Sequence, residues 1–172
     1  MSIFLPTKYY KDIYSINYEL LKSKGIKCIL FDLDNTLVPF KEKSPNDDLS
    51  DLFKKLINDG FKVIIFTNAK YNRIKPFIDL GVDYNCNSLK PLRYNFKRII
   101  KKYNYSLDEV CIIGDQLYTD ILGGNRVGIM TILVTPLSRD DFLITKFLRF
   151  LEIKTMNHFE KKGLFKREKY DE

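Results

Sequence analysis

The sequence predicts an α/β fold in which a mostly parallel sheet of five strands carries helices on both faces. Short apolar runs rich in β-branched residues alternate along the chain with segments of helix length. Each run is too short for a buried helix and is apolar throughout, as expected for a strand that is covered on both sides. A chain of 172 residues is long enough for one sizeable core and short for two, so we expect a single domain over residues 1–172.

The expected elements follow one another as strand and helix. The strands are predicted at 27–32, 62–67, 82–86, 110–115 and 129–135, with 82–86 the weakest pattern. The helices between them are predicted at 45–60, 69–81, 91–104 and 116–124. The first helix has Ser44 as a candidate N-cap, Pro45 at its first position and Gly60 beyond its end. Helical crossovers between consecutive strands favour a parallel sheet.

The remaining segments are two flanks around a core of about 27–138. Residues 1–26 and 139–172 have the pattern of helical additions that pack on the core or extend from it. The composition, 45% hydrophobic and 30% charged, is that of a soluble globular protein. No stretch approaches the ~20 apolar residues of a membrane span, and the first residues lack the pattern of a signal peptide. We therefore expect a cytoplasmic protein whose three cysteines are reduced.

Polar side chains gather where the predicted strands end, which is where ligands bind to open parallel sheets. Asp32 and Asp34 leave the first strand two residues apart, so both carboxylates can turn toward one cavity. Their mutual repulsion requires a cation. Asp115 ends another strand and Asp120 follows it, while Gly114 allows a close approach of the backbone. Four carboxylates at one site suit Mg²⁺, although aspartates at such positions also cap helices and turns.

Groups that bind phosphate are expected beside these carboxylates. Thr67 and Asn68 lie at the end of the second strand and offer a hydroxyl, an amide and backbone N–H groups to an anion. Lys90 precedes another helix and supplies a positive charge. The alternative role for Thr67 and Asn68 is to cap the helix that follows them.

Four motifs, "DLDNT" at 32–36, "TN" at 67–68, "KP" at 90–91 and "GDQLYTD" at 114–120, occur in this order at the strand ends. Together they resemble the haloacid dehalogenase (HAD) superfamily of phosphatases, whose core is a three-layer Rossmann-like fold. The resemblance implies that Asp32 is the nucleophile that forms an aspartyl-phosphate, and that Asp34 is the general acid and base. A second aspartate at this position implies a hydrolase rather than a dehalogenase.

The same resemblance implies roles for the other motif residues. Thr67 and Lys90 would hold the phosphoryl oxygens, and Lys90 would also orient Asp32. Asp32, Asp115 and the backbone carbonyl of Asp34 would hold Mg²⁺, with Asp120 supporting this shell.

The intervals between the motifs indicate that no cap domain is present. Only 32 residues separate Asp34 from Thr67 and 22 separate Thr67 from Lys90, each filled by the predicted helix and its loops. An uncapped cavity is open to solvent and suits a phosphate that is carried by a large molecule.

The flanks indicate what that molecule is. The net charge is +7; residues 1–27 contribute five lysines against two acids, and residues 146–169 contribute eight basic residues against three glutamates. Aromatic and apolar residues lie among these charges, and the pattern of 141–162 predicts a basic amphipathic helix. These faces either bind an anionic membrane surface or pack on the core.

A longer resemblance favours a lipid substrate. The segments "GIKCILFDLDNTLVP" (25–39), "GGNRVGIMT" (123–131) and "TKFLRFLE" (145–152) look like the YqeG-type branch of HAD phosphatases, which is similar to mitochondrial phosphatidylglycerophosphate phosphatases. This implies hydrolysis of phosphatidylglycerophosphate to phosphatidylglycerol and phosphate, by a cytoplasmic protein peripheral to the inner face of the membrane. Arg126 is a candidate to bind the second phosphate group of the lipid.

Two other interpretations of the function stay open. The same site suits a nucleic acid 3′-phosphate or a phosphoprotein, although the sequence shows no recognised platform for single-stranded nucleic acid. A protein without catalytic activity, binding membranes or proteins through its basic flanks, is the other alternative. The oligomeric state is left open.

Overall fold

The computed structural model describes residues 2–138, 143–164 and 171, and it contains a parallel sheet of six strands in the order β1-β6-β5-β2-β3-β4. Every pair of neighbouring strands is parallel, which confirms the predicted α/β class and adds one strand to the predicted five. The strands are β1 (Lys8–Tyr10), β2 (Cys28–Phe31), β3 (Lys62–Phe66), β4 (Asp83–Asn85), β5 (Val110–Gly114) and β6 (Met130–Val134).

The additional strand is β1, which lies in the flank that we expected to be helical. It pairs with β6 from Lys8 opposite Ile132 to Tyr10 opposite Val134. The backbone N–H of Thr7 extends this pairing by donating to the Thr131 carbonyl at 2.9 Å. A strand of three residues is too short for its periodicity to be recognised in the sequence. The N-terminal flank is therefore part of the sheet.

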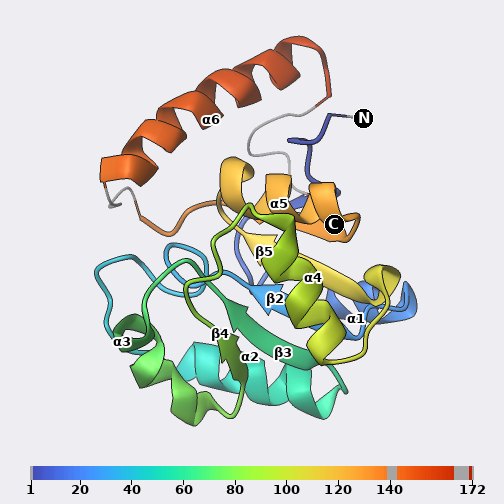
Figure 1. Ribbon diagram of the computed structural model, residues 1–172, viewed down its shortest axis with the longest axis vertical. Helices are drawn as coiled ribbons and strands as arrows, with labels where there is room; N and C mark the ends of the chain where they lie inside the picture. The colour runs from blue at the N-terminus through green and yellow to red at the C-terminus, as the bar shows by residue number, and fades with distance from the viewer. Residues whose placement is uncertain (1, 139–142, 165–170, 172) are drawn as a thin grey trace.

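Helices cover both faces of the sheet, as predicted (Figure 1). On one face, α1 (Tyr18–Ser23) and α2 (Asp47–Asn58) share a core with β2 and β3, in which the rings of Phe31 and Phe53 lie 5.6 Å apart. On the other face, α4 (Arg93–Lys102) and α5 (Leu122–Val127) pack on the alternate side chains, with Phe66 against Phe96 at 4.7 Å.

The boundaries of two helices differ from the prediction for identifiable reasons. The N-cap of α2 is Asn46 rather than Ser44, because the Asn46 side chain accepts a hydrogen bond from the backbone N–H of Leu49 at 2.9 Å. The helix predicted at 69–81 is divided into α3 (Tyr71–Ile74) and a 3₁₀ segment, η1 (Lys75–Leu80). Pro76 is the second residue of this segment and has no N–H to continue an α-helix.

The connection from β5 to α5 contains a π-helical turn, η3 (Leu117–Ile121), and a short 3₁₀ segment, η2 (Leu107–Glu109), precedes β5. The C-terminal helix, α6 (Leu143–Lys161), lies along one end of the molecule (Figure 1). It is docked on η3, where the buried Glu152 carboxylate accepts a hydrogen bond from the Leu117 backbone N–H at 2.7 Å. The Tyr118 and Thr155 hydroxyl groups are also 2.8 Å apart.

The two flanks differ in what they bury. In the N-terminal flank, Ile13, Ile16 and Leu21 are buried in the main core, so this flank packs on the sheet. In α6, by contrast, Phe150 and Ile153 keep 53% and 49% of their surface exposed. Among the helices in the part of the chain that the structure describes, none is both long and apolar enough to cross a membrane.

Candidate active site

The parallel sheet brings the predicted site residues to one edge. β2 lies between β3 and β5, and the residues that follow these strands are Asp32, Thr67 and Asp115, all of them buried. The Asp32 backbone N–H donates to the Ile113 carbonyl at 2.9 Å, which continues the β2–β5 pairing as far as the aspartate. The three side chains therefore start from positions that are fixed by the sheet.

Lys90 is the buried cation of this site. Its ammonium group lies 2.6 Å from an oxygen of Asp32 and 2.6 Å from an oxygen of Asp120, and only 2% of its side chain is exposed. Burial alone lowers the pKa of a lysine, but the attraction of the two carboxylates outweighs it and raises the pKa of Lys90 above its ordinary value. Lys90 is therefore protonated at neutral pH.

Asn68 holds Lys90 in place. Its side-chain oxygen accepts a hydrogen bond from the Lys90 backbone N–H at 2.7 Å, and its amide nitrogen donates to the Lys90 carbonyl at 3.1 Å. The amide that we expected to meet the substrate is thus bonded to the protein itself. The neighbouring Thr67 hydroxyl accepts from the Ala69 backbone N–H at 3.1 Å and closes the turn before α3.

Three of the four predicted carboxylates form a compact group. One oxygen each from Asp32, Asp115 and Asp120 lies within 4.8 Å of the others, and all three residues are buried. Gly114 makes this possible, because a Cβ at that position would overlap the Asp120 carboxyl group. The Thr36 hydroxyl donates to Asp115 at 2.9 Å and orients it.

Burial of this group perturbs the ionisation of two members. Desolvation raises the pKa of Asp115 to about 6, opposed by Arg149 and reinforced by Asp32. Desolvation likewise raises the pKa of Asp120 to about 7, against the attraction of Lys90. Clustered carboxylate oxygens that are hard to ionise together suit a small divalent cation, which prefers oxygen ligands. The donor set therefore fits Mg²⁺.

Asp34 stands apart from this group. Its carboxylate accepts a hydrogen bond from Nε of Arg73, in α3, at 2.8 Å. Burial raises the pKa of Asp34, and Arg73 opposes that rise. Asn35 follows in the left-handed backbone region with φ of 63°, and a bridge between Asp34 and Val38 closes the loop. No sequence pattern indicates the Asp34–Arg73 pair, because 39 positions separate the two residues.

A second arginine reaches the site from α6. Arg149 forms an ion pair with the Asp115 carboxylate, donates to the Asp115 carbonyl at 2.7 Å and pairs with Glu152 at 3.0 Å. The sequence prediction placed this segment on a membrane or on the core, not over the strand ends. α6 therefore covers part of a cavity that we expected to be open.

The cavity beside Asp32 has a volume of about 610 Å³. It is lined by Asp32, Asp34, Phe40, Thr67, Asn68, Ala69, Lys90, Pro91, Gln116, Tyr118, Thr119, Leu122 and Leu148. The sequence prediction thus named five of the lining residues and missed those contributed by η3 and α6.

The structure does not place Arg126 among the residues that line this cavity. Leu122, at the start of α5, lines the cavity, but Arg126 is exposed near the other end of the helix. Four residues along a helix correspond to a rise of about 6 Å away from the strand ends. Gly128 then ends the helix and leads into Met130, where β6 begins at the opposite edge of the sheet.

The parallel sheet, the aspartates after its central strand, the buried lysine and the oxygen cluster define a phosphatase of the haloacid dehalogenase type. Family models agree with this class: one described as haloacid dehalogenase-like hydrolase matches residues 29–89, and one described as HAD-hydrolase-like matches 89–136. The chain is 37% identical over 161 residues to the probable phosphatase YqeG of Bacillus subtilis (strain 168), covering 93% of this chain and 94% of that protein. The chain belongs to this YqeG-type family of HAD-like phosphatases.

Two further similarities extend this result. The chain is 30% identical over 173 residues to phosphatidylglycerophosphate phosphatase 1, chloroplastic/mitochondrial, of Arabidopsis thaliana, covering 93% of this chain and 49% of that protein. The fold is similar to the cobalt-bound deoxy-D-mannose-octulosonate 8-phosphate phosphatase of Haemophilus influenzae, with a TM-score of 0.53 at 14% identity, covering 80% of this chain and 94% of that one. The structural similarity supports the fold alone.

Proposed function

We propose that this phosphatase hydrolyses phosphatidylglycerophosphate to phosphatidylglycerol and phosphate, with Mg²⁺ as its cofactor. The choice of substrate is supported by the similarity of nearly the whole chain to the Arabidopsis phosphatidylglycerophosphate phosphatase. The basic flanks, predicted to attract anionic surfaces, are consistent with a lipid whose head group carries phosphate.

In the proposed reaction, an oxygen of Asp32 attacks phosphorus, the bond from phosphorus to the glycerol oxygen breaks, and an aspartyl-phosphate forms. The Lys90 ammonium group, 2.6 Å from Asp32, orients the nucleophile and offsets the charge of the phosphoryl oxygens. The Thr67 hydroxyl lines the cavity and binds a phosphoryl oxygen. Asp34, whose pKa is raised by burial, gives its proton to the departing glycerol oxygen.

The second step uses the same groups in reverse. The Asp34 carboxylate, left ionised by the first step, takes a proton from water, and the resulting hydroxide attacks phosphorus. The bond between phosphorus and the Asp32 oxygen then breaks and releases inorganic phosphate. Arg73 holds the Asp34 carboxylate in place during both proton transfers. Asn68 acts on the substrate indirectly, by positioning Lys90.

Asp32, Asp115 and the Asp34 backbone carbonyl would hold Mg²⁺, and Asp120 would support them from the carboxylate group described above. When bound, the cation neutralises the charge that otherwise keeps an anionic phosphate away from these carboxylates.

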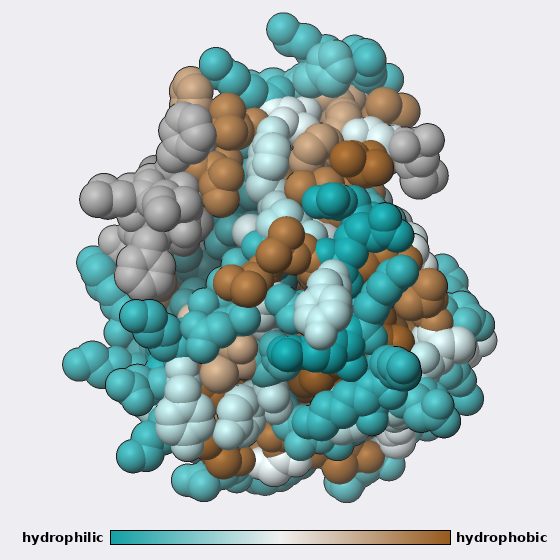
Figure 2. All heavy atoms as spheres, viewed as in Figure 1, coloured by the Kyte–Doolittle hydropathy of each residue, from teal (hydrophilic) through white to brown (hydrophobic). Residues whose placement is uncertain are grey.

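We place the working protein in the cytoplasm, bound peripherally to the inner face of an anionic membrane. Exposed Phe150 and Ile153 on α6 lie beside Lys154, whose ammonium group is 4.5 Å from the centre of the Phe150 ring. Aromatic and aliphatic side chains next to lysines suit the boundary between lipid head groups and hydrocarbon. Figure 2 shows apolar and hydrophilic side chains side by side in the region of α6.

The proposal is tested by measuring phosphate release from four substrates side by side. These are vesicles containing phosphatidylglycerophosphate, a 3′-phosphorylated oligonucleotide, a phosphopeptide and an aryl phosphate, each with Mg²⁺ and with EDTA. We expect the lipid to be turned over with the highest kcat/KM, dependent on Mg²⁺. The Asp32→Asn variant, folded by circular dichroism, should lose activity toward all four. Faster release from the oligonucleotide or the phosphopeptide than from the lipid would contradict the proposed substrate.

A further inference from the structure

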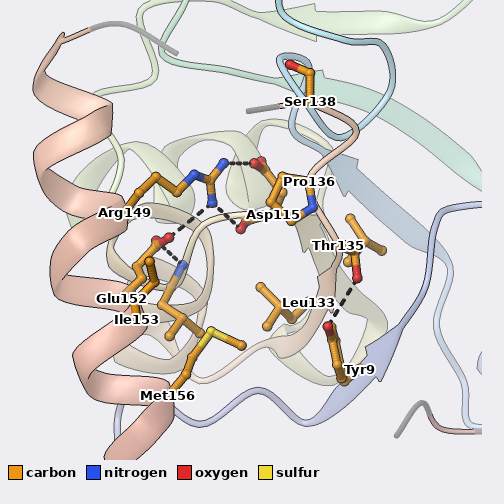
Figure 3. Close-up of a pocket in the computed structure, with 12 residues that line it drawn as sticks. Tyr9, Asp115, Leu133, Thr135, Pro136, Ser138, Arg149, Glu152, Ile153 and Met156 are labelled. Atoms are coloured by element: carbon orange, nitrogen blue, oxygen red, sulfur yellow. Dashed lines mark hydrogen bonds and ion pairs between the residues drawn. The ribbon is translucent and has the colours of Figure 1, made fainter. Parts of the chain in front are cut away.

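A second cavity, of about 490 Å³, adjoins the candidate active site on the side of α6. It lies between α6 and the strands β1 and β6, as Figure 3 shows. Most of its wall is hydrocarbon, supplied by Leu117, Leu133, Val134, Ile153 and Met156. This volume and this lining are typical of pockets that bind small molecules or parts of them.

The polar side chains in its wall have hydrogen-bonding or ionic partners within the protein. The Tyr9 and Thr135 hydroxyl groups are 3.1 Å apart, and Arg149 is paired with Asp115 and Glu152 (Figure 3). Because these groups already have protein partners, entry of an apolar ligand does not require them to lose hydrogen bonds to water. The cavity therefore favours hydrocarbon over a polar ligand such as a nucleotide or a peptide backbone.

This cavity and the cavity beside Asp32 are close enough for one molecule to reach both. Asp115 lines the apolar cavity, and one of its oxygens lies within 4.8 Å of an oxygen of Asp32. α6 also contributes to both, through Leu148 to the cavity beside Asp32 and through Ile153 to the apolar cavity. Five residues of helix correspond to about 7.5 Å, a span shorter than a phosphorylated glycerol head group with the start of its acyl chains.

We propose that the apolar cavity between α6 and β6 binds an acyl chain of an anionic phospholipid whose terminal phosphate lies at Asp32. This inference rests on the proposed function and adds the site for the lipid tail. The chemistry agrees at both ends: hydrocarbon side chains line most of the cavity, and Arg149 lies at its polar end, in contact with Asp115. The recognised part of the ligand is thus a hydrocarbon chain joined to a phosphate.

The absence of tryptophan from the sequence allows a direct binding test. The Ile153→Trp variant places one fluorescent side chain at the mouth of the cavity, at a position that is 49% exposed. The matched control is Ile57→Trp, since Ile57 is 40% exposed on α2 and lines neither cavity. The probes are dioctanoyl- and dihexanoyl-phosphatidylglycerol below their critical micelle concentrations.

We expect a saturable blue shift in Ile153→Trp and none in Ile57→Trp. Binding of the dioctanoyl lipid should be roughly tenfold tighter than that of the dihexanoyl lipid, because one bound chain buries two more methylene groups. If Ile153→Trp does not fold, Met156→Trp reports on the same wall. Equal responses at positions 153 and 57, or equal affinity for the two lipids, would overturn the inference.

A kinetic measurement separates this inference from the proposed function. Phosphate release is compared for dioctanoyl phosphatidylglycerophosphate and for its deacylated head group. The acyl site is supported if the wild type has a lower KM for the acylated substrate than for the head group, and if this difference in KM is smaller in Met156→Gln. If both substrates are turned over with the same KM, the proposed phosphatidylglycerophosphatase function stands and the proposed acyl site is overturned. Failure to hydrolyse either one, together with chain-length-dependent binding in Ile153→Trp, overturns the proposed function and supports the acyl site.

Discussion

Replacing Lys90 by methionine tests how the buried charges of the active site are balanced. The lysine is in contact with Asp32 and Asp120, whose side chains are 7% and 0% exposed, so its removal leaves two buried carboxylates without their shared cation. Removing one partner of a buried ion pair costs roughly 3–5 kcal/mol of unfolding free energy. We expect a loss of about this size for Lys90→Met in EDTA at pH 9, measured by urea unfolding followed by circular dichroism.

The loss should be smaller at pH 7. The pKa of Asp120 is about 7 in the presence of Lys90, and removal of the cation raises it further. Between pH 7 and this higher pKa, the folded variant holds a proton that the wild type and the unfolded chain do not. The variant therefore gains stability relative to the wild type as the pH falls through this window, by up to about 1.4 kcal/mol per pH unit.

A matched control distinguishes burial from simple loss of charge. Lys54 pairs with Asp51 at 3.2 Å, but the two side chains are 71% and 75% exposed, so Lys54→Met should change stability by only about 0.5 kcal/mol or less. Adding Asp120→Asn to Lys90→Met should recover part of the loss. A similar effect of Lys90→Met and Lys54→Met, or a loss that does not depend on pH, would refute this account of the site.

Three further predictions concern the groups around the nucleophile. Gly114→Ala should displace the Asp120 carboxyl group, destabilise the fold by roughly 1–3 kcal/mol and weaken Mg²⁺ binding; unchanged unfolding and calorimetry would count against the close approach. Arg73→Met should raise the pKa of Asp34 further, because the arginine opposes the effect of burial. The limb of the pH profile of kcat/KM for an aryl phosphate that reports on Asp34 should therefore move to higher pH. An unchanged limb would show that Asp34 does not carry out the proton transfer. Arg149→Gln should tighten Mg²⁺ binding about tenfold in calorimetry, because the arginine competes with the cation for a carboxylate; weaker binding would show that it instead supports the metal site.

The parts of the fold that the sequence predicts well are those that are set by local patterns. β3 and β5 are short runs that each contain three β-branched residues, and each ends within one residue of the prediction. β1 was missed because its three residues become a strand only by pairing with β6. The N-cap of α2 was misplaced because Ser44 and Asn46 are both good caps, and only the geometry of the loop selects the second.

In the candidate site, too, the sequence predicts what local patterns determine and misses what tertiary packing determines. Asp32, Thr67 and Asp115 were found because a parallel sheet necessarily brings the ends of neighbouring strands together. Arg73 and Arg149 were missed because their partners are fixed by how α3 and α6 pack, which leaves no short-range signal. Asn68 was placed correctly near the site, but no pattern indicates that its amide binds the Lys90 backbone.

The central claim is that Asp32 becomes phosphorylated during turnover. It is tested most directly by acid quenching of the Asp34→Asn variant during reaction with p-nitrophenyl phosphate, followed by peptide mass spectrometry. The nitrophenolate leaving group departs without a proton from Asp34, so the first step can proceed in this variant. The variant lacks the base that our mechanism requires for the second step, so we predict one phosphoryl group on Asp32, removed by hydroxylamine. Release of nitrophenolate by the variant with no phosphoryl group at Asp32, or with the group on another residue, would contradict the account.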